Sequence, residues 1–171
     1  MPHYDRFRHH RRSIRLRNRD YRCPGAYYVT ICAEGKGEIM GAIANGKVIL
    51  NKTGGIVDAC WKAIPEHFAG VRLDVWVVMP DHLHGILFIP HGVPDREHGA
   101  QNTALVAPGS LGSIVRSFKA AVSREVNRLA GDEGVSFWQR NYYERVLRND
   151  EEIKARREYI AGNPLRVHQE A

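Results

Sequence analysis

Two apolar runs stand next to each other near the middle of the chain, VRLDVWVVMP at residues 71–80 and HLHGILFIP at residues 82–90. β-Branched and aromatic residues dominate both runs, and these residue types favour strands. Pro80 and Asp81 lie where the runs meet, and both residue types favour turns. The two runs therefore predict consecutive strands of one sheet.

Three further elements are expected before this pair. Residues 25–33 (GAYYVTICA) follow a proline and predict a strand. The dipeptide Asn45-Gly46 between two apolar runs predicts a hairpin. From Lys52 onwards the apolar residues have helical spacing, which predicts an amphipathic helix that ends at Pro65.

After the pair, the pattern changes several times. Residues 91–109 have three glycines and two prolines and predict a loop, whereas residues 110–129 have the apolar spacing of a second long helix. Residues 137–149 are aromatic and predict an extended segment. We expect a last helix, capped by Asp150 and ended by residues 162–164, which contain glycine and proline.

This order of strands and helices predicts an α+β fold, with a ferredoxin-like antiparallel sheet and helices packed mainly on one face. The length of 171 residues is typical of one domain, and 43% hydrophobic residues are enough for a real core. We therefore expect an N-terminal arm, residues 1–22, and a single domain, residues 23–171.

The basic charge of the protein is concentrated in that arm. Residues 1–22 contain eight Arg and two Asp, a net charge of +6 that equals the net charge of the whole chain. Such a block is often a solvated tail, but arginine also binds phosphates in a sequence-tolerant and salt-dependent way. Nucleic acid is the leading partner, and the arm's candidate contacts are Arg11, Arg12, Arg15 and Arg17.

The expected location is the cytoplasm, with no membrane as a partner. The sequence has no apolar run of membrane-spanning length, and its N-terminus lacks the apolar core of a secretory signal. Its three cysteines form no CxxC pair, which argues against a disulfide framework and a thiolate zinc site.

Two histidines interrupt the second apolar run. His82 and His84 are two positions apart, so in a strand they project from one face while Leu83 projects from the other. Neighbouring imidazoles are suited to share a divalent metal ion. The alternative interpretation is a pair of half-buried polar residues at a strand end.

Four segments together resemble a known family: PGAYYVTIC, VWVVMPDHLHGILF, FWQRNYYERVLRN and REYIAGNP, in that order along the chain. They resemble the HUH class of single-tyrosine transposases, and within it the REP-associated tyrosine transposases. The family's His-hydrophobic-His motif falls on His82, Leu83 and His84. The resemblance extends from about Arg12 to Val167.

The resemblance implies a catalytic tyrosine at Tyr159 and a third metal ligand at Asn163, four positions later on the same helix face. Without the motif, the favoured interpretation of Tyr159 is a residue of the apolar stripe of that helix, with Ile153 and Ile160, and the motif reverses this preference. The implied metal is Mg²⁺ or Mn²⁺, which would withdraw charge from a phosphate that the tyrosine attacks. Asp81 is a candidate acceptor that orients His82, or simply a turn residue.

The implied activity is that of a single-strand endonuclease and strand transferase, acting on single-stranded or hairpin DNA through a 5′-phosphotyrosine. Other candidate DNA contacts are Arg116, Lys119, Arg145 and Arg148, although each could simply keep its element soluble. The rival functions are a nucleic-acid-binding module without catalysis and a histidine-metal phosphoesterase. Both a monomer and a domain-exchanged homodimer remain open.

Overall fold

The computed structural model describes residues 24–35, 37–91, 109–131 and 136–170, with backbone alone for the last five. The predicted arm lies outside the described residues, and so do its arginines at positions 11, 12, 15 and 17. The same holds for most of the loop predicted at residues 91–109. Among the described residues, no helix has the length and apolar character that a membrane span requires.

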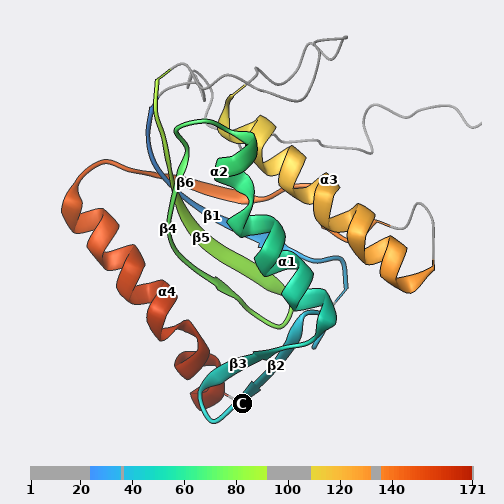
Figure 1. Cartoon of the computed structure of the whole chain (residues 1–171). Helices are drawn as coiled ribbons and strands as arrows, with labels where there is room; N and C mark the ends of the chain where they lie inside the picture. Colours follow the sequence, from blue (N-terminus) through green and yellow to red (C-terminus); the bar gives the residue numbers. More distant parts are fainter. Residues whose placement is uncertain (1–23, 36, 92–108, 132–135, 171) are drawn as a thin grey trace, which may run out of the picture.

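A four-stranded antiparallel sheet forms the centre of the fold (Figure 1). Its strands are β1 (Gly25–Cys32), β4 (Arg72–Val78), β5 (His82–Ile89) and β6 (Tyr143–Leu147), in the spatial order β4-β5-β1-β6. With a helical segment of two consecutive helices between β1 and β4 and one helix between β5 and β6, this is the ferredoxin-like arrangement. The predicted fold class is therefore confirmed.

The helices cover both faces of this sheet unequally (Figure 1). The helices on one face are α1 (Lys52–Lys62), the short α2 (Ile64–His67) and α3 (Leu111–Ala130). The last helix, α4 (Asp150–Glu170), packs on the opposite face. The helices thus lie mainly on one face, as predicted, and α4 stands alone on the other.

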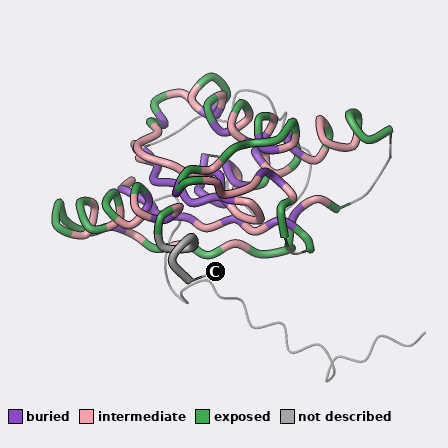
Figure 2. Tube along the Cα trace, turned by 90° about the horizontal axis from the view of Figure 1, so that it is seen from below, coloured by how far each residue is buried: buried purple, intermediate pink, exposed green. Residues whose placement is uncertain are grey.

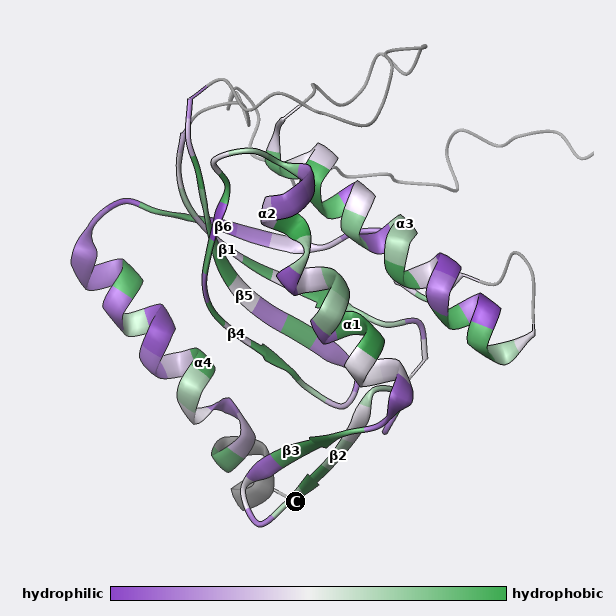
Figure 3. Ribbon diagram, viewed as in Figure 1, coloured by the Kyte–Doolittle hydropathy of each residue, from purple (hydrophilic) through white to green (hydrophobic). Residues whose placement is uncertain are grey.

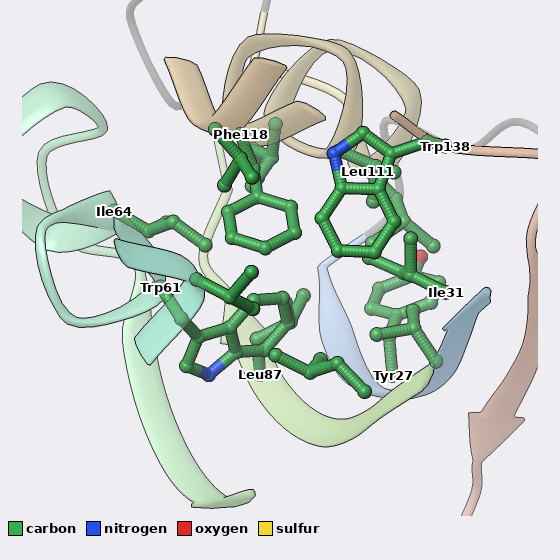
Figure 4. Close-up of a cluster of buried hydrophobic side chains, with 14 of the residues drawn as sticks. Tyr27, Ile31, Trp61, Ile64, Leu87, Leu111, Phe118 and Trp138 are labelled. Atoms are coloured by element: carbon green, nitrogen blue, oxygen red, sulfur yellow. The ribbon is translucent and has the colours of Figure 1, made fainter. Parts of the chain in front are cut away.

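Successive side chains of β1 point to opposite faces of the sheet and so belong to two different hydrophobic clusters. Tyr27 belongs to the larger core under α1 and α3, whereas Tyr28 belongs to the smaller cluster under α4. In the larger core the rings of Trp61 and Phe118 meet edge to face, with centroids 5.2 Å apart (Figure 4). Burial is concentrated in the strands and on the inner sides of the helices (Figure 2). The central strands are therefore clamped between two packed layers.

The predicted hairpin forms a separate two-stranded sheet of β2 (Gly41–Ala44) and β3 (Lys47–Leu50). Asn45 and Gly46 have φ angles of 52° and 69°, as a two-residue turn with two left-handed positions requires. The hairpin is largely hydrophobic (Figure 3) and contacts α4. It therefore supports the helix beyond the edge of the main sheet.

The helix predicted to end at Pro65 does end shortly before it, because α1 stops at Lys62, and Pro65 itself lies in the first turn of α2, where its missing N–H is not needed. Two other predicted helix boundaries are wrong. The side chain of Asn149, and not that of Asp150, accepts the hydrogen bond from the backbone N–H of Glu152, at 2.8 Å. Finally, α4 continues through Pro164 to Glu170.

The continuation of α4 has a tertiary cause. A proline inside a helix removes one backbone hydrogen bond but does not by itself force the chain to leave the helix. Here the segment after residue 159 is held by the β2–β3 hairpin, where Gly46 approaches Leu165. The extended aromatic segment predicted at residues 137–149 contains a strand only in β6, at Tyr143–Leu147. Earlier in the segment, Trp138 makes only an isolated bridge with Ala33.

Candidate active site

The two histidines of β5 project toward α4. His84 lies opposite Thr30 of β1 in the register, and both side chains are on the α4 face, whereas Leu83 is buried in the core on the other face. This confirms that the two imidazoles share one side of the strand. Their Nε2 atoms are 3.1 Å apart. The pair therefore presents two ring nitrogens at a single point.

The remaining nitrogen of each ring has its own partner. His82 Nδ1 lies 2.6 Å from a carboxylate oxygen of Asp81, which accepts a hydrogen bond, so in the neutral ring the proton is on Nδ1 and the Nε2 lone pair is available. His84 Nδ1 lies 2.8 Å from the hydroxyl of Tyr28 and 2.9 Å from that of Thr30. These hydroxyls can accept an Nδ1 proton, which leaves the Nε2 lone pair of His84 available.

His84 is held in its neutral form. It is 5% exposed, and burial lowers its pKa to about 3, with smaller contributions from the charges of His82 and Arg156. Neutral imidazole is the form that binds metal ions. The environment of His84 therefore suits a ligand.

The donor pair fits a divalent ion. Neighbouring nitrogens at about 2.1 Å from an octahedral ion are about 3.0 Å apart, whereas on a tetrahedral ion they are about 3.4 Å apart. The observed 3.1 Å is closer to the octahedral value. In the described parts of the chain no group of three or more His, Cys, Asp or Glu side chains is placed to hold an ion together. Within the described residues, a third protein ligand would thus be of another type.

Asn163 is the residue that the sequence suggests as the third metal ligand, through its side-chain amide. Because α4 continues past it, Asn163 lies one turn beyond Tyr159 on the same helix face. It is 5% exposed and buried beneath the helix. Its side chain makes no hydrogen bond within the described residues. An amide oxygen is a ligand type that Mg²⁺ and Mn²⁺ accept, which makes Asn163 a candidate for the third ligand.

Tyr159 stands beside the histidines of its own chain. Its ring centroid lies 5.4 Å from that of His84, at an interplanar angle of 70°, and 6.4 Å from that of Tyr28. The side chain is half-buried and lines an open hollow of about 340 Å³ between β6 and α4. The phenol is therefore near the histidine pair and also reachable from outside.

Two polar residues of β1 belong to this site although the sequence did not single them out. Tyr28 and Thr30 are two positions apart and share the face that bears His84, to which both side chains are bonded. The sequence predicted only that both residues lie in a strand over residues 25–33. Their partner was hidden, because a pairing between β1 and β5 joins residues more than 50 positions apart.

Arg156 is a third such residue. Its guanidinium carbon lies 4.9 Å from the ring centroid of Tyr28 and 5.7 Å from that of Tyr159. It also lines the hollow beside Tyr159. The spacing of three residues between Arg156 and Tyr159 places both on one helix face, and this was the signal available in the sequence.

The four described candidates for DNA contacts lie in different places. Arg145 of β6 lines the hollow beside Tyr159 and forms an ion pair with Glu152, at 3.3 Å. Arg148 lines a second hollow, of about 370 Å³, at the start of α4. Arg116 and Lys119 belong to α3, on the opposite face of the sheet. Of these four residues, only Arg145 therefore lies at the hollow beside Tyr159.

Lys119 connects α3 to the segment that precedes β6. Its ammonium group donates hydrogen bonds to the backbone carbonyls of Gln139 and Asn141, at 2.8 and 2.9 Å. Burial lowers its pKa to about 8. These contacts tie the segment before β6 to α3 and use two of its three donors.

No family model matches the chain. An uncharacterized protein of Haemophilus influenzae is 40% identical over 163 residues, which cover 92% of this chain and 89% of that protein. At this identity and coverage the two proteins have a common ancestor and a common fold.

Among solved structures, the chain is similar to a REP-associated tyrosine transposase bound to a REP hairpin. The TM-score is 0.60 and the sequence identity is 18%, over 89% of this chain and 74% of that chain. At such low identity the similarity establishes the fold, and the site must be argued from its own residues.

Proposed function

The chain belongs to the same protein family as the Haemophilus influenzae relative, and from the fold and site of this member we propose that it cuts and rejoins single-stranded DNA through Tyr159. The observation that carries this proposal is the position of the phenol. Its ring lies 5.4 Å from His84, on the face where the two histidine Nε2 atoms meet. This position beside a proposed metal ligand is what favours a nucleophile over a tyrosine that only packs against the core.

The proposed reaction is a transesterification. The Tyr159 oxygen attacks the phosphorus of a phosphodiester and loses its proton, a P–O bond to tyrosine forms, and the bond from phosphorus to the 3′ oxygen breaks. The leaving 3′ oxygen takes up a proton. The DNA 5′ phosphate is then attached to the protein, and a 3′ hydroxyl can reverse the step without an external energy source.

The metal that this chemistry implies is Mg²⁺ or Mn²⁺, held by His82, His84 and Asn163. When bound, such an ion withdraws negative charge from the phosphate and aligns it for in-line attack. The chain's own contribution is to orient the ligands. Asp81 fixes the ring of His82, and the hydroxyls of Tyr28 and Thr30 fix the ring of His84.

The proposed substrate is single-stranded DNA, folded as a hairpin. The structurally similar transposase was solved with a REP hairpin, and an exposed strand gives a single tyrosine access to the backbone. Arg145 at the hollow beside Tyr159 is placed to meet a phosphate there. Residues 1–22, with their eight arginines, are proposed to bind the same DNA.

A covalent-capture experiment tests this function without knowledge of the recognised sequence. A pool of hairpin oligonucleotides with random single-stranded flanks is incubated with the protein and Mn²⁺, and denaturing gels detect DNA that stays attached. We expect an adduct that depends on the metal and disappears in Tyr159→Phe. Tyr143→Phe is the control, because that tyrosine is 53% exposed on the neighbouring strand β6.

The rival functions give different results in the same assay. A binding module retards the DNA in a native gel but leaves no adduct under denaturing conditions. A phosphoesterase releases products without any attached intermediate. An adduct that persists in Tyr159→Phe would assign the nucleophile to another residue.

A further inference from the structure

Arg156 occupies a place on α4 where an apolar residue would be expected. The residues of this helix that face the sheet are Ile153, Arg156, Ile160 and Asn163, spaced by three or four positions. Their neighbours Lys154, Ala155 and Arg157 are exposed. Arg156 is half-exposed, so its charge is only partly removed from water, and the question is what its guanidinium binds there.

The contacts within the protein compensate this charge only partly. The guanidinium lies against the faces of Tyr28 and Tyr159, and cation–π contacts of this kind are weak at a half-exposed position. In the described part of the chain, no carboxylate lies within ion-pair distance of Arg156.

Two nearby acidic residues, Glu152 of α4 and Asp74 of β4, pair with other arginines. Glu158, which lines the same hollow as Arg156, forms no ion pair with it in the described part of the chain. Glu152 pairs with Arg145 on the β6 side, at 3.3 Å. On the β4 side, Asp74 pairs with Arg157, at 2.7 Å. The positive charge of Arg156 is therefore not neutralised by either of them.

The guanidinium of Arg156 and the phenol of Tyr159 border the same hollow. Both Arg156 and Tyr159 line the hollow of about 340 Å³ between β6 and α4. The hollow is also lined by Arg145, Glu152 and Glu158, so an anion there would bind beside two guanidinium groups and the phenol, with the carboxylate of Glu152 already paired to Arg145. Guanidinium groups bind phosphates through two parallel hydrogen bonds, which also fix the orientation of the phosphate.

We propose that Arg156 binds the DNA phosphate that Tyr159 attacks, which makes the hollow between β6 and α4 the phosphate site of this protein. This inference rests on the proposed function of Tyr159. Arg156 then has two effects. It places the phosphorus next to the phenol oxygen, and it stabilises the negative charge that grows on the non-bridging oxygens during attack.

The first test measures binding alone, without metal and without cleavage. In the Tyr159→Phe background, the affinity for a thymidine oligonucleotide is followed over a range of salt concentrations in EDTA. The plot of log affinity against log salt has a negative slope. Arg156→Gln should reduce the magnitude of this slope by about 0.7, the value for one phosphate contact on a single strand. Lys154→Gln, which removes an exposed cation two residues away, is the matched control.

The second test measures chemistry in the Tyr159 protein. Arg156→Gln should form the covalent adduct about a hundredfold more slowly than the parent, since one donor to the reacting phosphate is lost. Arg156→Lys keeps the charge and should recover part of the rate and the full salt slope. Lys154→Gln should retain the parental rate. Thermal unfolding of each variant shows whether it is folded.

The outcomes separate this inference from the function on which it rests. If a folded Arg156→Gln protein has the same slope and the same adduct rate as Lys154→Gln, the phosphate role of Arg156 is wrong while the nucleophile stands. If the parent protein forms no adduct, the proposed function fails, and the salt slope still decides whether Arg156 binds a phosphate.

Discussion

His84 shows how a single side chain combines stability and function. It is buried under α4, bonded to Tyr28 and Thr30 through Nδ1, and turned toward His82 through Nε2. An imidazole in such a place must stay neutral, because the buried site disfavours its charged form. The same condition keeps its lone pair ready for a metal ion, so burial and the proposed role as ligand support each other.

The stability of the metal-free protein should therefore fall in acid. The pKa of His84 is about 3 in the folded protein, whereas its ordinary value is 6.5, so the unfolded chain binds more protons between these values. Folding stability from this residue is complete above pH 6.5 and declines below it, by at most about 1.4 kcal/mol per pH unit. We expect denaturant unfolding in EDTA to show this slope between pH 6.5 and 5.

The variant His84→Gln should flatten that slope. His91→Gln, at an exposed position after β5, should leave it unchanged and controls for the loss of a histidine. An unchanged slope in His84→Gln would show that other groups cause the acid sensitivity.

At the scale of elements, the position of β5 depends on how closely α1 approaches it. A Cβ atom at Gly85 would lie 2.5 Å from the Trp61 ring, so only glycine allows the indole to pack directly on the strand next to His84. Trp61 is fully buried and also packs on Phe118 of α3, so it has no free space to move into. The glycine therefore fixes the distance between the helical layer and the strand of the histidines.

Gly85→Ala should destabilise the protein by about 1–3 kcal/mol, since the added methyl group overpacks the core. Chemical denaturation measures this change. Gly55→Ala is the control on α1, where an added Cβ meets no atom within 4 Å, and it should leave stability equal or raise it by up to about 1 kcal/mol. Equal stability of both variants would mean that Trp61 can shift without cost.

At the scale of the whole molecule, one chain contains all the proposed catalytic groups. The helix α4 returns to the sheet from which it comes and places Tyr159 beside His84 of the same chain. A domain-exchanged dimer would instead combine the tyrosine of one chain with the histidines of another. In the arrangement seen here, the proposed nucleophile and the proposed histidine ligands come from the same chain.

A mixing experiment tests this arrangement. Tyr159→Phe lacks the nucleophile and His84→Ala lacks a proposed ligand, so each alone should form no adduct. We expect an equimolar mixture of the two to stay inactive as well, even after unfolding and refolding together. Recovery of up to about a quarter of the parental adduct yield, the share expected from random pairing of subunits, would point to exchange of α4 between chains.

Much of the fold could be predicted because its signals are local. The strand pair around Pro80, the turn at Asn45-Gly46 and the three long helices all follow from short patterns, and each is present. The end of α4 was predicted wrongly because residues 162–164 do contain helix-breaking types. What keeps the helix intact there is the β2–β3 hairpin, more than 100 residues away in the sequence.

The sequence by itself determined that His82 and His84 share one face of a strand, because alternation along a strand is a property of the local backbone. Only the tertiary structure decided which face α4 covers, and with it that Tyr28, Thr30 and Arg156 surround the pair. The buried stripe of α4 contains few apolar residues, so no local pattern specifies its partner. That choice depends on the burial of whole faces and on the order of the strands, which join residues far apart along the chain.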